Sequence, residues 1–226
     1  MRTVIAGGHG QIALRLERLL AGRGDEVGGL IRRPEQADDL RAAGAEPVVC
    51  DLESASVDEV ARHLRGADAA VFAAGAGPGS GAARKDTVDR AAAVLFADAA
   101  ERAGVRRFLV VSAMGVDHEP PAGMDPVFAA YLRAKGAADD YVRGRLDLDW
   151  TILRPGRLTD EPGTGNVELG AHTGRADVSR DDVAAVLLAL LDDPRSVGLT
   201  LELVGGRTPI DQAVAALGAA ATEVPD

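Results

Sequence analysis

Two residues four positions apart, Tyr131 and Lys135, carry the clearest chemical signal in the chain. On a helix this spacing places both side chains on one face. A phenol is a poor acid–base group at its usual pKa of about 10, and a fixed cation nearby favours the phenolate and lowers that pKa. The pair therefore predicts an acid–base tyrosine tuned by a lysine. The structural alternative is a half-buried helix tyrosine beside a solvated lysine.

Ser112 ends the apolar run Phe108–Ser112, which predicts a buried strand. Ligands of open parallel sheets bind at the carboxyl ends of the strands, so Ser112 is expected at the ligand edge. There its hydroxyl could hold a substrate carbonyl while Tyr131 transfers the proton.

A glycine-rich turn separates the first apolar run from the first amphipathic one, with the sequence Gly7-Gly8-His9-Gly10-Gln11-Ile12-Ala13. Glycine permits a tight turn and close approach of the backbone to a ligand. A helix N-terminus adds free N–H groups and the positive end of the helix dipole, which suit a pyrophosphate. The strand–turn–helix context predicts a dinucleotide site. The alternative is a tight turn that binds nothing.

The second predicted strand ends at Ile31-Arg32-Arg33. An NAD-specific protein usually has Asp or Glu near this position for the ribose 2′-hydroxyl, whereas a guanidinium can form paired hydrogen bonds with a 2′-phosphate. The sequence therefore favours NADP over NAD, the alternative being two solvated loop arginines. Asp51, just past the third predicted strand, is a candidate acceptor for the adenine amino group or, equally, a cap before a helix.

Short apolar runs alternate with longer amphipathic ones along the chain. Strands are predicted over residues 2–6, 26–31, 47–50, 69–73, 108–112, 150–153 and 200–204. Helices are predicted over 12–21, 34–43, 56–64, 86–103, 127–143, 178–191 and 209–217. Brief apolar strands joined by helical crossovers require a parallel sheet covered on both faces. The predicted fold is a doubly wound α/β sheet.

Local patterns give further expectations. The buried face of the first helix should carry Ile12, Leu16, Leu19 and Leu20. Ser179 and Asp182 form a capping-box pattern, in which each side chain bonds a backbone N–H. Cys50 is expected to be a small core residue. Solvated arginines are expected beside a helix C-terminus at Arg102, Arg106 and Arg107, and the tail 219–226 is expected to be frayed.

Composition limits the class of protein. A chain of 226 residues that is 46% hydrophobic predicts one domain over 1–226, with 156–178 and 205–226 forming a small substrate lobe. The net charge of −10 argues against nucleic-acid binding. No apolar run approaches the ~20 residues of a membrane span, and the N-terminus does not resemble a signal peptide, which favours the cytoplasm. One Cys and four dispersed His argue against a metal site. The oligomeric state, monomer or homodimer, stays open.

Taken together, the motifs resemble the short-chain dehydrogenase/reductase superfamily, specifically its atypical and extended NAD(P)H-binding members of the epimerase/dehydratase-like and NmrA-like kind. The resemblance covers most of residues 1–204. Besides the glycine turn it is carried by Arg32-Arg33-Pro34, Asp51-Leu52, Ser112-Ala113-Met114-Gly115, Tyr131 with Lys135, Arg154-Pro155-Gly156 and Ser179-Arg180-Asp181-Asp182-Val183-Ala184. These motifs are fairly specific for the family but not for a substrate.

The resemblance implies a Rossmann fold and assigns roles to matched positions. Tyr131 would be the acid–base group, Lys135 would bind the nicotinamide ribose, and Ser112 would orient the substrate carbonyl. No residue can be assigned to the catalytic Asn of the family. The implied cofactor-binding residues are Gly7, Gly8, His9, Gly10, Gln11, Ile12, Arg32, Arg33, Asp51, Leu52, Ala73, Ala74, Gly75, Lys135 and Pro155.

The first functional hypothesis is therefore an NADP-dependent oxidoreductase. Hydride would move between nicotinamide and a small carbonyl, quinone or flavin-like substrate, since the lobe is too short to enclose a nucleotide-sugar. Two alternatives stay open: a non-catalytic NADPH-binding redox sensor, and an enzyme of the sugar epimerase or dehydratase kind.

Overall fold

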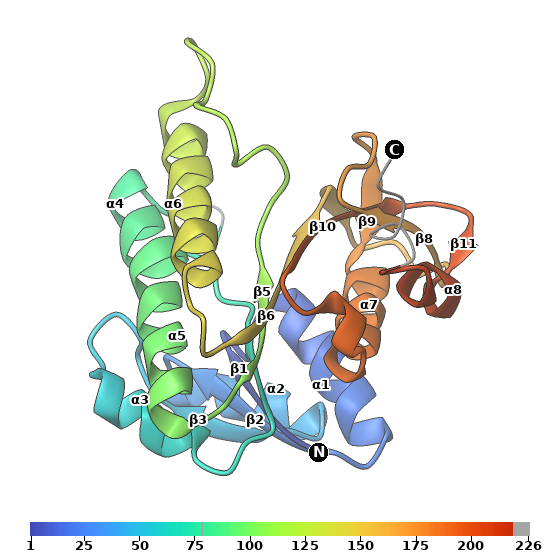
Figure 1. Ribbon diagram of the computed structural model, residues 1–226. Coiled ribbons are helices and arrows are strands. Elements are labelled where there is room, and N and C mark those ends of the chain that lie inside the picture. The colour runs from blue at the N-terminus through green and yellow to red at the C-terminus, as the bar shows by residue number, and fades with distance from the viewer. Residues whose placement is uncertain (78, 219–226) are drawn as a thin grey trace.

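The chain folds around a nine-stranded sheet in this computed structural model, which describes residues 1–77 and 79–218 (Figure 1). Seven of these strands are parallel: β1 (Arg2–Ala6), β2 (Glu26–Ile31), β3 (Glu46–Val49), β4 (Ala69–Phe72), β5 (Arg107–Val111), β6 (Asp149–Pro155) and β10 (Leu199–Gly205). They lie in the order β3-β2-β1-β4-β5-β6-β10. The order reverses between β1 and β4, which is where doubly wound folds bind their ligands.

Helices cover both faces of this sheet (Figure 1). On one face α1 (Gln11–Gly22) packs against α7 (Arg180–Asp192), and on the other α5 (Ala92–Ala103) lies between α3 (Val57–Leu64) and α6 (Pro126–Arg143). Two apolar cores result, one under each layer. Shorter helices are α2 (Ala37–Ala42), α4 (Ala82–Arg84) and α8 (Ile210–Ala215). The doubly wound α/β prediction is confirmed. Among these helices none is both long and apolar enough to cross a membrane.

Four short strands were not predicted. Antiparallel β8 (Asn166–Gly170) and β11 (Thr208–Pro209) extend the main sheet beyond β10, and β7 (Arg157–Thr159) pairs with β9 (Asp177–Ser179) in a second sheet. Runs of two to five residues carry almost no period-two signal, so the sequence pattern could not reveal them. They lie in the two segments expected to form a substrate lobe, whose substrate role stays a prediction. Residues 219–226, including the expected frayed tail, lie outside the described residues.

The predicted helix 86–103 is interrupted near its start. Residues Lys85–Ala91 form a π-helical segment between α4 and α5. The wider turns place Lys85, Val88 and Asp89 on the buried side. A π-helical turn inside a helix is often found at a functional site, and this one faces the cavities described below.

At the start of α7, the Asp182 side chain bonds a neighbouring loop and does not complete the predicted capping box. Ser179 accepts a hydrogen bond from the Asp182 N–H at 2.9 Å, as predicted. The Asp182 carboxylate, however, accepts from the Thr164 and Gly165 N–H groups at 3.0 and 2.8 Å. The reciprocal half of the capping box is therefore wrong, because the carboxylate serves loop amides that lie closer to it in space.

Arg107 also differs from expectation, because its guanidinium is not solvated. It donates to the carbonyl oxygens of Leu190 and Leu191 at the end of α7 and to the Ser196 and Thr151 hydroxyls. Burial lowers the pKa of Arg107 to about 10. The side chain ties α7 to β5 and β6 by satisfying helix carbonyls that lack an intrahelical partner.

Helix α1 buries Leu16 and Leu20 as predicted, but the rest of its buried face differs from the prediction. Leu19 is 38% exposed, while the buried stripe consists of Ala13, Leu16, Glu17 and Leu20. Glu17 is fully buried, and neither of its carboxylate oxygens has a hydrogen-bond partner among the described residues. A Cβ at Gly29 would lie 2.7 Å from Glu17 Oε1, so the glycine of β2 makes room for the carboxyl. Burial raises the pKa of Glu17 to about 8.

This raised pKa predicts a stability that falls with pH. The folded chain keeps a proton that the unfolded chain has already released, so the free energy of unfolding decreases as pH rises from about 5 to about 8. In this window the free energy of unfolding of the wild type should fall, relative to that of Glu17→Gln, by up to about 1.4 kcal/mol per pH unit. Urea unfolding at several pH values measures the difference. Equal pH slopes for the wild type and Glu17→Gln would contradict a raised pKa of Glu17 in the folded chain. The control is Glu26→Gln, at an exposed position, whose pH slope should equal that of the wild type.

Candidate functional site

The turn between β1 and α1 provides an anion site. Gly7 has a φ of +78°, and a Cβ there would lie 2.6 Å from the Ala74 Cα, so only glycine fits between β1 and the end of β4. The N-cap residue of α1, Gly10, makes no side-chain cap, and the first turn contains no acidic residue. The Gly8 and Gly10 N–H groups already bond the Leu30 and Gly7 carbonyls, but the N–H groups in the first turn of α1 have no intrahelical acceptor and are free to bind a negatively charged group. The arrangement fits a pyrophosphate.

Two cavities meet at this turn. The first, called here the glycine-turn cavity, has a volume of about 250 Å³ and reaches from Gly7 to Arg32. The second, called the lysine cavity, has a volume of about 540 Å³ and contains Tyr131 and Lys135. Both are lined by Gly10, Ala73, Ala74 and Gly75. A single groove therefore crosses the switch point from the end of β2 to the start of α6.

Most of the predicted site residues lie along this groove. The glycine-turn cavity is lined by Gly7, His9, Gly10, Arg32, Asp51, Leu52, Ala73, Ala74 and Gly75. The lysine cavity adds Ile12, Ser112, Tyr131, Lys135 and Pro155.

Three predicted residues do not line either cavity. Gly8 donates its N–H to the Leu30 carbonyl at 2.9 Å and packs beneath the turn against Gly29. The Gln11 side chain accepts a hydrogen bond from Arg15 at 2.9 Å. Arg33 is exposed at the start of a short helical turn. Their predicted contact with a cofactor therefore has no support from the cavity geometry.

Lys135 is buried among oxygen atoms in the lysine cavity. Its Nζ donates to the Val111 and Ala74 carbonyl oxygens at 3.0 and 3.4 Å and lies 3.6 Å from the Asp89 carboxylate. Asp89 is itself fully buried, and its Oδ1 has no hydrogen-bond partner among the described residues. This oxygen lies within ion-pair distance of Lys135 Nζ, and Asp89 lines the cavity beside that ammonium group.

Lys85 is a second ammonium group in the lysine cavity that the sequence analysis did not identify. Its Nζ donates to the Gly77 carbonyl at 2.9 Å and lies 5.3 Å from the centroid of the Tyr131 ring. The chain has 23 arginines but only two lysines, and both line this cavity. The rarity of lysine was therefore the one signal that could have indicated Lys85.

The expectation that Lys135 lowers the pKa of Tyr131 is wrong for this arrangement. Burial raises the pKa of Tyr131 above its ordinary value, and the negative charges of Asp89 and Asp139 raise it further. Lys135 does not compensate, because its charge is balanced by Asp89 and burial lowers its own pKa. Tyr131 is therefore protonated at neutral pH.

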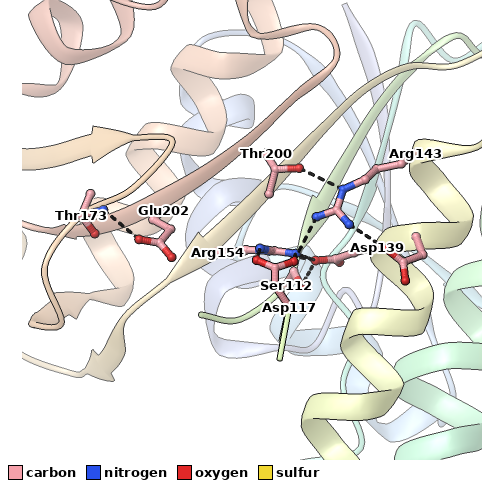
Figure 2. Close-up of polar contacts among 9 residues, drawn as sticks. Ser112, Asp117, Asp139, Arg143, Arg154, Thr173, Thr200 and Glu202 are labelled. Carbon is pink, nitrogen blue, oxygen red and sulfur yellow. Dashed lines mark hydrogen bonds and ion pairs between the residues drawn. The ribbon is translucent and has the colours of Figure 1, made fainter. Parts of the chain in front are cut away.

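Ser112 belongs to a buried network of hydrogen bonds and ion pairs (Figure 2). The Ser112 hydroxyl donates to Asp139 Oδ2 at 2.9 Å, and Arg154 donates to the same oxygen through Nε and Nη2 at 3.0 and 2.8 Å. Arg154 also pairs with Asp117, which is half exposed. Because its hydrogen faces Asp139, Ser112 presents lone pairs to the cavity. The predicted donation from Ser112 to a substrate carbonyl stays a prediction, and it requires this hydrogen bond to be exchanged.

A third cavity, called the outer cavity, opens beside Tyr131 with a volume of about 490 Å³. It shares Ser112, Tyr131 and Pro155 with the lysine cavity, so the two are continuous. Apolar side chains form much of its wall, including Met114, Phe128, Leu132 and Leu158. Arg157 pairs with Asp177 at the rim, and Arg175 lies there as well.

An ion-pair cluster closes the other end of the groove. Glu53 accepts hydrogen bonds from Arg84 at 2.5 Å, from the Thr87 hydroxyl at 2.6 Å and from Arg32 at 3.4 Å. Arg32, Glu53 and Arg84 all line the glycine-turn cavity. Sequence reasoning did not identify Glu53 or Arg84, because they are 31 positions apart in the chain and pair only in the folded structure.

Cys50 also lines the glycine-turn cavity but is only 4% exposed, which confirms its placement in the core. Burial raises the pKa of the Cys50 thiol to about 11. Among residues 1–77 and 79–218, no group of three His, Cys, Asp or Glu side chains is arranged to hold a metal ion.

Comparison with known proteins identifies the family. The family model for NAD(P)H-binding proteins matches residues 7–194. The chain is 36% identical over 215 residues to the uncharacterized sugar epimerase YhfK of Bacillus subtilis, covering 95% of this chain and 99% of that protein. A solved Bacillus halodurans structure carrying the name NAD-dependent epimerase/dehydratase superposes with a TM-score of 0.87 at 36% identity, covering 96% and 100% of the two chains. The oxidoreductase ylbE of Lactococcus lactis superposes with a TM-score of 0.83 at 28% identity, covering 96% of each chain.

The network beneath Ser112 predicts a large effect of removing Arg154. Arg154→Met leaves the fully buried Asp139 carboxylate without its charged partner, which should cost about 3–5 kcal/mol of unfolding free energy. The double variant Asp139→Leu/Arg154→Met should recover most of that loss, because neither Asp139 nor Arg154 then leaves its partner's charge buried and unpaired. Urea unfolding measures both. The matched control is Arg157→Met, whose side chain is 79% exposed and should cost under about 1 kcal/mol; equal losses in the two single variants would contradict the prediction.

Proposed function

The chain belongs to the NAD(P)H-binding family, and on that premise we propose that it is an NADP-dependent oxidoreductase that reduces a small carbonyl, quinone or flavin-like substrate. The observation that carries the proposal is the continuous groove from Arg32, past the free amides of α1, to Tyr131. Its two halves match the two halves of a dinucleotide, and its far end opens into the outer cavity.

The residues present fit such a cofactor. The first turn of α1 suits the pyrophosphate, and Arg32 suits the 2′-phosphate of the adenosine ribose. The Asp89 carboxylate and the Lys135 ammonium group, which form an ion pair in the lysine cavity, would bind hydroxyl groups of the second ribose. Tyr131 and Pro155 border the space left for the nicotinamide ring.

A bound nicotinamide would supply the hydride that reduces the substrate, at the carbonyl carbon where the substrate is a carbonyl compound. Tyr131 supplies the proton, and the O–H bond of the phenol breaks as the new O–H bond forms at the carbonyl oxygen. The raised pKa of Tyr131 keeps the phenol protonated at neutral pH and so supports the reductive direction. Lys85 above the ring then stabilises the phenolate that is left after proton transfer.

The outer cavity supports the substrate class. Its apolar walls suit a flat, weakly polar molecule such as a quinone or the ring system of a flavin. The arginines at its rim suit an acidic substituent that extends from that ring system.

An epimerase or dehydratase is the second candidate, favoured by the names of the Bacillus subtilis and Bacillus halodurans relatives. Such a reaction begins with proton removal from a substrate hydroxyl, for which a protonated Tyr131 is poorly suited. Net consumption of NADPH distinguishes the two, since an epimerase returns the hydride to its substrate.

Cofactor preference gives the first test of the proposal. NADPH should raise the melting temperature more than NADH at equal concentration, because tighter binding to the folded chain stabilises it more. Arg32→Gln should remove the difference. The exposed Arg41→Gln, with the same charge change, should keep it. Equal shifts for the two cofactors in the wild type would count against Arg32 as the 2′-phosphate ligand.

Tyr131 gives the second test. Tyr131→Phe should lower NADPH-dependent reduction of menadione or FMN by at least about 100-fold and leave NADPH affinity within about twofold. The control is Tyr141→Phe, whose hydroxyl donates to Asp98 away from the groove and should leave the rate unchanged.

An unchanged rate in Tyr131→Phe would remove this residue from the mechanism. Tight NADPH binding without turnover of any carbonyl, quinone or flavin by the wild type would instead favour the redox-sensor alternative.

A further inference from the structure

The glycine-turn cavity already contains a carboxylate at the place where a 2′-phosphate would bind Arg32. The Arg32 guanidinium, 43% exposed, lies 3.4 Å from the Glu53 carboxylate. Glu53 lines the cavity together with Arg32. A phosphate that approaches Arg32 therefore meets a negative charge close to its intended partner, and like charges at such distances repel.

Glu53 is fixed in place from three sides. Its backbone N–H donates to the Asp51 carboxylate at 3.1 Å, which sets the turn after β3. Its side chain accepts the short hydrogen bonds from Arg84 and Thr87 described above. These two donors, Arg84 foremost, hold the pKa of Glu53 below its ordinary value, so the carboxylate is ionised throughout the neutral range.

The Glu53 carboxylate lies much closer to Arg84 than to Arg32, and this difference in distance determines how strongly it interacts with Arg32. The hydrogen bond from Arg84 is short, whereas the contact from Arg32 is long and easily exchanged. Arg84 thus draws the carboxylate toward α4 and neutralises part of its charge. Without Arg84 the same carboxylate would be free to form a closer pair with Arg32.

From this arrangement we propose that Glu53 sets the preference between NADPH and NADH by competing with the 2′-phosphate for Arg32. In this proposal Arg84 limits the competition, because its hydrogen bond holds the Glu53 carboxylate toward α4 and away from Arg32. The inference rests on the proposed binding of the 2′-phosphate by Arg32. Glu53 is a specificity-determining residue in this account, and Arg84 is a positioning residue that acts through it.

The test is a double-mutant cycle on the full chain. Dissociation constants for NADPH and NADH are measured by calorimetry for the wild type, Glu53→Gln, Arg84→Gln and the double variant, at low salt and at about 0.15 M salt. Glu53→Gln should tighten NADPH binding by about two- to fivefold and leave NADH within about twofold, as expected for a partly exposed ion pair. Arg84→Gln should weaken NADPH binding by a similar factor. In the Glu53→Gln background the Arg84 substitution should have no effect.

Matched controls separate these effects from general changes in charge. Asp58→Asn and Arg90→Gln make the same charge changes at exposed ion pairs that do not line the cavity, and both should leave the NADPH-to-NADH affinity ratio unchanged. The expected effects should shrink at the higher salt concentration, because exposed charges are screened.

Three results would overturn the inference alone. One is an unchanged affinity ratio in Glu53→Gln, and another is a large loss of NADH affinity there, which would make Glu53 a ligand of the 2′-hydroxyl. The third is an equal loss from Arg84→Gln in both backgrounds, which would mean that Arg84 binds the phosphate directly. A wild-type chain that binds neither cofactor would overturn the proposed function and this inference with it.

Discussion

The geometry of the groove depends on the Asp139 carboxylate, which connects three elements of the fold. It accepts from Ser112 just past the end of β5 and from Arg154 on β6, while its own backbone belongs to α6. One turn earlier on the same helix is Lys135, and one turn before that is Tyr131. Anchoring Asp139 therefore fixes the rotation of α6 about its axis and points both side chains into the lysine cavity. Burying this charge is unfavourable by itself, and Arg154 offsets the penalty. The buried Asp139 carboxylate is therefore unfavourable locally, but it fixes the orientation of α6, on which the positions of Tyr131 and Lys135 depend.

The framework of the fold could be predicted because it follows from repeating local signals. Each parallel strand is a short apolar run followed by a helix, and a glycine turn stands between β1 and α1. The face that α1 buries could not be predicted from the same signals. Leu19 belongs to the apolar pattern yet is exposed, and Glu17 breaks the pattern yet is buried. The packing of α1 against β2 and α7 determines this choice, and a pattern within one helix contains no information about its neighbours. The short strands of the lobe escaped prediction because each is stabilised by its partner rather than by its own composition.

In the candidate site, too, local motifs predict some residues, while others are brought together only by tertiary packing. Most residues that a local motif marks, such as Gly7 and Gly10 of the glycine turn and Tyr131 with Lys135, lie along one groove, and their roles there stay predictions. The groups that determine their chemistry come from elsewhere in the chain and carry no motif. Burial, together with the charges of Asp89 and Asp139, reverses the expected shift in the pKa of Tyr131. Glu53 reaches Arg32 only because β2 and β3 are neighbours. A spacing rule finds the reactive side chain, but the electric field that acts on it depends on tertiary contacts.

The burial of Cys50 has a consequence for the conditions under which this protein can work. Oxidants and alkylating agents react with the thiolate form of cysteine, and a pKa of about 11 leaves very little thiolate at neutral pH. Cys50 is the sole cysteine in the sequence, and it borders the glycine-turn cavity. The chain therefore carries no easily modified sulfhydryl beside its reactive groove, and exposure to peroxide should not block that groove through cysteine damage.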